Sequence, residues 1–222
     1  MNSFINILLL IFTFPTMLLS IFIGFDLPVE FLRTTARTMP YASEILLGFG
    51  MLLLIISLRR SIRRWMGVRM TIQTKKFKWN SVISQSRKQR VLVYTLIEAS
   101  VLLGLAFGYY LLTPIAWFPA LVMLVFSVES IVFLLVCKGN LFRVGLSSKA
   151  IIVSDREVIL IYLTGLRQVS ISQQTVYFDY INDLQLSFPT DCLQANEKNE
   201  FFENLSNLVD KNKVLFRNVT SS

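Results

Sequence analysis

Two glutamates in otherwise apolar segments are the residues best placed to do chemistry. Glu98 follows Arg90 by eight residues, and Glu129 precedes Lys138 by nine residues. If both segments are membrane-spanning helices, a rise of about 1.5 Å per residue puts both carboxyl groups ~12–14 Å from the same membrane surface. A carboxyl group in hydrocarbon is costly, so it usually faces protein and marks an ion pathway or a polar contact.

Hydroxyl groups lie close to these glutamates in the sequence, since Ser127 and Ser130 flank Glu129. Three interpretations stay open: a contact with another helix or subunit, a proton or ion pathway, and a neutral glutamate that only bonds across helices. We predict that both carboxyl groups face protein and that at least one is protonated, because like charges at one depth repel each other. With only four spans, a transporter would have to oligomerise to enclose a pathway, and the sequence shows no internal repeat. Both points count against the ion pathway.

A basic segment between apolar segments sets the expected orientation. Residues 59–90 hold eleven Lys and Arg and no Asp or Glu, and the whole chain is 54% hydrophobic and 16% charged. Cationic loops stay in the cytoplasm. We therefore expect an integral protein of the plasma membrane or the bacterial inner membrane. Its four transmembrane helices form two hairpins, at about 4–25, 41–58, 91–112 and 115–137, and both termini are cytoplasmic.

The basic loop is expected to hold some regular structure. Residues 59–66 can continue the second span as a helix, residues 68–72 alternate as a strand does, and a helix into the third span can begin at Asn80–Ser81 or at Ser84. The loop either stays solvated and sets the topology, or binds anionic lipid headgroups or a protein partner. We do not expect nucleic acid as a partner, because no binding motif accompanies the charge. The cations expected at such contacts are Arg59, Arg60, Arg63, Arg64, Lys75, Lys76 and Lys78.

Small residues recur at every fourth position of the third span, at Ser100, Gly104 and Gly108. Such a stripe lets another helix approach closely, so we expect helix packing on this face. It lies about 200° around the helix from Glu98, so one face could pack while the other presents the carboxyl group.

The composition changes after Lys138, so we divide the chain into a transmembrane domain at 1–138 and a cytoplasmic β-rich α+β domain at 139–222. Strands are predicted at 149–153, 157–163, 166–172, 176–180 and 183–188, with ordinary hairpin turns between the first ones. An amphipathic helix is predicted from an Asn196 N-cap, with Phe201, Phe202 and Leu205 on its apolar face. A last strand is predicted at 214–219.

Several short strands followed by one amphipathic helix, together with the segment VYFDYINDLQLSF at 176–188, resemble the pleckstrin-homology-like domains found after transmembrane hairpins in bacterial membrane proteins. The resemblance covers residues 145–212. It implies an antiparallel sheet with a C-terminal helix. Four preceding spans depart from the usual arrangement, and this scaffold serves lipid-binding, peptide-binding and purely structural roles alike. The alternative is an unrelated small sheet that pairs with the strand predicted at 68–72.

Enzymatic chemistry has little support in the sequence. The chain has no His, and its two Cys, Cys137 and Cys192, lie in no motif, so we expect no metal site, no cofactor and no disulfide. We therefore expect an integral-membrane accessory or scaffold subunit, which docks a cytoplasmic or membrane partner through its basic loop and C-terminal domain. The alternatives are a proton- or ion-coupled transporter or channel subunit that uses Glu98 and Glu129, and a membrane sensor that binds anionic lipid. Other subunits or further copies of the chain are the expected protein partners.

Overall fold

The computed structural model describes residues 14–15, 18–29, 34–35, 38–137, 139–181, 184–210 and 213–217. The predicted first span at 4–25 lies mostly outside these residues, although residues 18–24 are helical. The count of four spans therefore stays a prediction. Between this segment and the next helix, β1 (Pro28–Val29) and β2 (Thr34–Thr35) form a short antiparallel pair.

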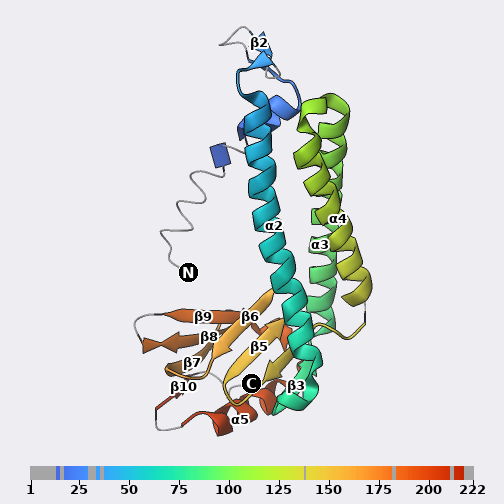
Figure 1. The fold of residues 1–222 in the computed structure, drawn as a ribbon. Helices are drawn as coiled ribbons and strands as arrows, with labels where there is room; N and C mark the ends of the chain where they lie inside the picture. The colour runs from blue at the N-terminus through green and yellow to red at the C-terminus, as the bar shows by residue number, and fades with distance from the viewer. Residues whose placement is uncertain are drawn as a thin grey trace. The chain divides into compact units, whose positions relative to one another are not determined.

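Three helices of the described residues are long and apolar enough to cross a membrane (Figure 1). They are α2 (Ala42–Ile72), α3 (Gln85–Leu112) and α4 (Trp117–Cys137). The single turn η4 (Pro114–Ala116) precedes α4, and its proline at the first position suits a helix start. These helices contain the predicted spans at 41–58, 91–112 and 115–137 almost entirely.

The strand predicted at 68–72 is wrong, because these residues are the last turns of α2. The buried positions Arg64, Val68 and Thr71 recur at three- and four-residue spacing, which is the period of a helix. A five-residue alternation was too short to distinguish the two periods. The helix predicted to begin at Asn80–Ser81 or Ser84 begins after Ser84, whose hydroxyl accepts a hydrogen bond from the Arg87 amide at 3.2 Å.

The chain divides into two compact units, and each long helix contributes to both of them. Unit 1 comprises residues 1–59 and 96–132, and unit 2 comprises residues 60–95 and 133–222. The boundary therefore cuts α2, α3 and α4 rather than following the loops.

Unit 1 is a helical core of apolar and small side chains. Gly24 and Gly108 permit close approach of residues 18–25 to α3, since Gly24 lies directly against the Tyr109 ring and a Cβ on Gly108 would lie 2.8 Å from the Phe25 ring. The Thr113 hydroxyl also donates to the Gly24 carbonyl. The buried core residues are Ile23, Ala42, Leu46, Phe49, Ala106, Tyr109, Ala116, Ala120 and Met123.

Unit 2 contains two four-stranded sheets (Figure 1). The first sheet is antiparallel throughout, in the order β3 (Trp79–Val82), β4 (Arg143–Leu146), β5 (Ala150–Ser154) and β6 (Val158–Tyr162). The second has the order β10 (Leu215–Arg217), β7 (Leu166–Ser172), β8 (Thr175–Tyr180) and β9 (Gln185–Pro189); only β10 is parallel to its neighbour. The single turns η3 (Thr74–Lys76) and η6 (Thr190–Cys192) precede β3 and follow β9.

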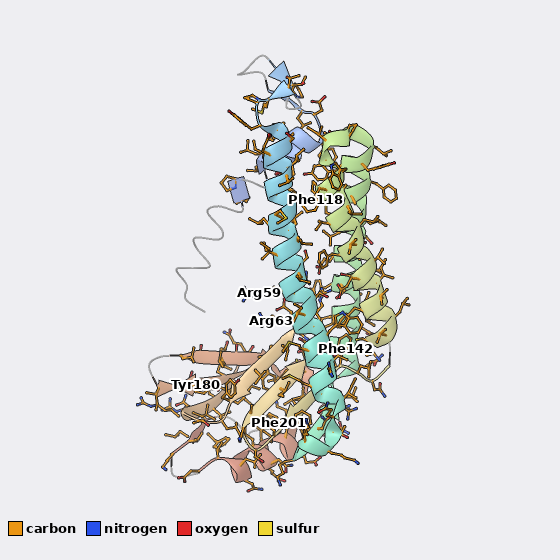
Figure 2. All side chains as sticks on the ribbon, viewed as in Figure 1. Arg59, Arg63, Phe118, Phe142, Tyr180 and Phe201 are labelled. Carbon is orange, nitrogen blue, oxygen red and sulfur yellow. The ribbon has the colours of Figure 1, made fainter. Side chains whose placement is uncertain are left out.

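The helix α5 (Lys198–Leu208) contributes an apolar face to the core of unit 2. Phe201, Phe202 and Leu205 are buried as predicted, and the Phe201 ring (labelled in Figure 2) lies 5.2 Å from the Trp79 ring. The N-cap is Glu197 rather than Asn196, and it makes no side-chain capping bond.

The five strands predicted between residues 149 and 188 are confirmed to within two residues at each end. Two strands of the first sheet were not predicted. β4 lies just after the last long helix, and β3 comes from the basic loop itself. Residues 79–82 of the loop therefore form a structural strand, and residues 85–90 are the first turns of α3.

Candidate functional site

The polar residues of the two apolar helices α3 and α4 lie at nearly one height in unit 1. Ser127 is fully buried, and its hydroxyl donates to the Ala99 carbonyl at 2.8 Å. This bond aligns residue 127 of α4 with residue 99 of α3. In the antiparallel pair of helices, Glu98 and Glu129 then differ in height by only about one residue rise, ~1.5 Å.

Glu98 and Glu129 are both half-buried. Ser130, which follows Glu129 in the sequence, is buried. The Ser127 hydroxyl has only one proton to donate, and it donates that proton to Ala99 rather than to Glu129. No group of three or more His, Cys, Asp or Glu side chains that could hold a metal ion occurs among the described residues. The arrangement therefore offers two carboxyl groups at one height without the ligand set of a metal centre.

Only one of the three residues of the predicted packing stripe on α3 packs closely against another segment of unit 1. Gly108 packs against Phe25, whereas a Cβ on Gly104 would meet nothing within 4 Å. Ser100 is exposed, and its hydroxyl bonds to the Leu96 carbonyl of its own helix at 2.9 Å. Within unit 1, close helix approach therefore uses one end of the stripe.

An apolar groove of about 380 Å³ lies between α3 and α4 in unit 1. Its lining includes Tyr110 and Trp117 but exposes no polar surface that would orient a substrate. This composition suits an apolar chain rather than a reactant. The remaining lining residues are Ala106, Phe107, Ala120, Leu121 and Leu124.

In unit 2, charged side chains tie the first turns of α3 to the sheets. Arg87 donates from Nε and Nη2 to Asp155 Oδ2 at 3.0 and 2.6 Å, and Asp155 is only 4% exposed. Arg87 Nη1 also lies 3.8 Å from Asp191 Oδ1, while Arg90 Nη2 lies 2.5 Å from Asp191 Oδ2. The Ser84 hydroxyl donates to the Asp191 backbone carbonyl at 2.5 Å. Two carboxylates and two guanidinium groups therefore form one partly buried network.

The last turns of α2 meet the same end of the first sheet. Arg63 donates to the Val158 carbonyl at 3.2 Å and lies 3.4 Å from Glu157, which Arg60 also approaches. A Cβ on Gly67 would lie 3.0 Å from the Val158 side chain, so the helix and the strand are in close contact here. We call this end of the sheet, with Arg60, Arg63, Arg87, Arg90, Asp155, Glu157 and Asp191, the anchor end.

The seven cations predicted to contact lipid or a partner have different environments in the structure. Arg64 is only 2% exposed, and its guanidinium lies 5.5 Å from the centre of the Phe133 ring. Arg60 and Arg63 contribute to the anchor end. Lys75, Lys76 and Lys78 are exposed near the start of β3, and Arg59, in unit 1, is exposed as well.

Phe77 holds the lysine-bearing segment on the sheet. A Cβ on Gly145 would lie 2.5 Å from the Phe77 ring, so the ring rests directly on the β4 backbone. The Lys78 amide donates to the Leu146 carbonyl at 2.8 Å. Glycine at position 145 is therefore required for this contact.

Cys192 lies beside the charged network and is fully buried. Burial, with the Asp155 carboxylate nearby, raises the pKa of its thiol. The thiol consequently stays protonated at neutral pH and is a poor nucleophile.

Comparisons of the sequence and the fold with protein-family models, curated proteins and solved structures find no match. The inference of function therefore rests on the geometry of these two units.

Proposed function

We propose that the chain is an integral-membrane accessory or scaffold subunit, with both termini in the cytoplasm, that docks a partner through its basic loop and C-terminal domain. The observation that supports this proposal is the pairing of β3, from the basic loop, with β4 of the domain. Because of this pairing, the loop and the domain present one surface. Asn80 and Arg143, which are 63 residues apart in the sequence, are joined side chain to side chain at 2.5 Å.

We propose further that unit 2 is a pleckstrin-homology-like scaffold. Its short antiparallel strands and α5 support this, as does the segment 176–188 that carries the resemblance. Two features depart from that pattern: β3 precedes the last two long helices in the sequence, and β10 follows α5. A scaffold of this kind serves lipid-binding, peptide-binding and purely structural roles, so the docking role rests on the surface of unit 2 and not on the fold.

The orientation can be tested by cysteine labelling. Single cysteines at Thr35, Ser86 and Ser206, in a Cys137→Ala/Cys192→Ala background, are expected to react differently with a membrane-impermeant maleimide. Position 35 should be modified only from outside the membrane, and positions 86 and 206 only from the cytoplasmic side. Labelling of position 35 from the cytoplasmic side would overturn the topology.

The accessory role can be tested by purification from the native membrane in mild detergent. We expect a second polypeptide in a fixed stoichiometric ratio, identified by mass spectrometry and retained at low protein concentration. A chain that purifies only as a monomer or homo-oligomer would contradict the proposal.

An ion-coupled subunit is the second candidate, and the matched heights of Glu98 and Glu129 favour it. Glu→Gln changes keep the shape and hydrogen bonding of the side chain but remove titration. Loss of activity in an intact assembly of either Gln variant would support ion coupling over the accessory role. Full activity of both Gln variants, with loss of assembly on Glu→Leu, would assign the carboxyl groups to packing.

An anionic-lipid sensor is the third candidate. The exposure of Lys75, Lys76 and Lys78 favours it, because exposed lysines can contact anionic headgroups.

A further inference from the structure

The end of the sheets opposite the anchor end gathers cations from three separate parts of the sequence. The start of β3, the turn between β4 and β5 and the start of β7 all lie along it, as the strand registers require. The Leu163 amide donates to the Lys149 carbonyl at 2.9 Å, and the Ile181 amide donates to the Gly165 carbonyl at 3.4 Å, so neighbouring turns are joined. We call this edge the cation rim; its exposed cations are Lys75, Lys76, Lys78, Lys149 and Arg167.

The cations of the rim have no carboxylate partner among the described residues, unlike those at the anchor end. The rim segments 73–78, 147–149, 163–167 and 180–184 contain a single acidic residue, Asp183, which lies outside the described residues. Three lysines from the basic loop and two cations from the domain therefore face solvent with little neutralising charge. Such a group of like charges favours an acidic partner.

Large apolar side chains border the same cations. Tyr162, Ile181 and Leu184 are 58%, 52% and 52% exposed. Tyr162 is the last residue of β6, and Ile181 and Leu184 lie between β8 and β9. The hydroxyl of Tyr180 (labelled in Figure 2), the last residue of β8, donates to the Tyr162 carbonyl at 2.5 Å and so joins the ends of β6 and β8. Exposed apolar side chains beside unpaired charge are typical of a protein-binding surface.

The rim and the anchor end lie at opposite ends of the first sheet of unit 2. α2 enters the unit at Arg60, at the anchor end, and its last turns run along the sheet for about 18 Å before Ile72. The strands of the first sheet, four or five residues long, separate the two ends by a similar ~13–16 Å. Within unit 2, the rim is thus the end of the sheet remote from Arg60 and the rest of the anchor end.

We propose that the cation rim binds an acidic segment of a partner protein, in which carboxylates alternate with apolar side chains. The carboxylates pair with Lys75, Lys76, Lys78, Lys149 and Arg167, and the apolar side chains cover Tyr162, Ile181 and Leu184. This inference rests on the proposed accessory function and deepens it, because it names the surface and the chemistry of the partner.

Fluorescence anisotropy with labelled peptides tests the proposal on the full chain in phosphatidylcholine nanodiscs. The probes are a peptide of alternating Glu and Leu, a Glu–Ser peptide of equal charge, and a Lys–Leu peptide. We expect the Glu–Leu peptide to bind about tenfold more tightly than the Glu–Ser peptide, and the Lys–Leu peptide not to bind. Equal binding of all three peptides, or of none, overturns the proposal.

Charge reversal separates the rim from general electrostatics. Lys75→Glu/Lys76→Glu is expected to weaken Glu–Leu binding about tenfold, whereas the matched control Lys198→Glu/Arg217→Glu, away from the rim, changes it by about twofold or less. Tyr162→Ser/Ile181→Ser should reduce Glu–Leu affinity to that of the Glu–Ser peptide. An equal effect of the rim and control reversals overturns the assignment. Tighter, rim-dependent binding of a single-stranded RNA or of phosphatidylserine nanodiscs would assign the rim to another partner class.

The same variants keep the two proposals distinguishable. If a native complex purifies intact with Lys75→Glu/Lys76→Glu, the rim is not the docking surface although the accessory function holds. If the chain purifies without a partner while the Glu–Leu peptide still binds at the rim, the accessory function fails and the rim keeps its binding chemistry.

Discussion

The two ends of the first sheet in unit 2 use cations from one basic loop in opposite ways. At the anchor end, Arg60, Arg63 and Arg87 each lie against a carboxylate. At the cation rim, Lys75 and Lys76 are exposed and meet no described carboxylate. Residue type and sequence neighbourhood are similar in the two cases. The role of each cation is therefore decided by whether the fold places an acidic side chain opposite it.

The largest expected effect comes from breaking the anchor end at Arg87. Arg87→Met leaves the Asp155 carboxylate buried without its guanidinium, and removal of one partner of a buried pair costs about 3–5 kcal/mol. The free energy of unfolding of unit 2, followed by tryptophan fluorescence in detergent, should fall by that order. The double variant Arg87→Met/Asp155→Asn should recover a large part of the loss, because no buried charge remains. A melting temperature of Arg87→Met equal to that of the wild type would show that the network is dispensable.

The next effect comes from the rim, where a methyl group on Gly145 would displace Phe77. Gly145→Ala is expected to destabilise unit 2 by about 1–3 kcal/mol, the usual cost of overpacking. Faster proteolysis within residues 73–78 should accompany the loss. Gly139→Ala is the matched control, because a Cβ there meets nothing within 4 Å. Recovery of stability in Gly145→Ala/Phe77→Leu would identify the contact, and no recovery would argue against it.

The buried thiol beside the anchor end predicts a pH dependence. The pKa of Cys192 is raised in the folded state by burial. Below about pH 8.5 both states keep the proton, so its contribution to stability is fully present. Above that pH the unfolded chain releases the proton and the folded chain does not, so stability falls by up to about 1.4 kcal/mol per pH unit.

Urea unfolding between about pH 8.5 and 9.5, in a Cys137→Ala background, measures this slope. The further change Cys192→Ala should flatten it. An unchanged slope in the double variant would assign the dependence to other groups.

The smallest effect concerns Arg63 and Glu157, an anchor-end pair whose side chains are 43% and 37% exposed. A double-mutant cycle with alanine at both positions should give a coupling energy of about 0.2–1 kcal/mol, since solvent and salt screen such pairs. The coupling should decrease further at high salt. A coupling energy as large as that of Arg87 with Asp155 would show that solvent exposure does not determine the strength of the ion pairs at the anchor end.

The sequence by itself determined the elements whose signals are local. Apolar composition over about twenty residues predicted the three long helices, and two-residue alternation predicted β5 to β9. The spacing of Phe201, Phe202 and Leu205 predicted the buried face of α5. Each of these signals lies within one stretch of chain, because it depends only on the period of a helix or a strand.

Only the tertiary structure decided which residues from distant segments meet. β3 has four residues in a basic loop, and it becomes a strand because β4 pairs with it from across two long helices. The same pairing brings Lys78 alongside the turn that carries Lys149. The carboxylates that pair with Arg63 and Arg87 also belong to residues more than sixty positions away in the sequence. The division of one basic loop into an anchor and a rim follows from these long-range contacts, on which local composition carries no information.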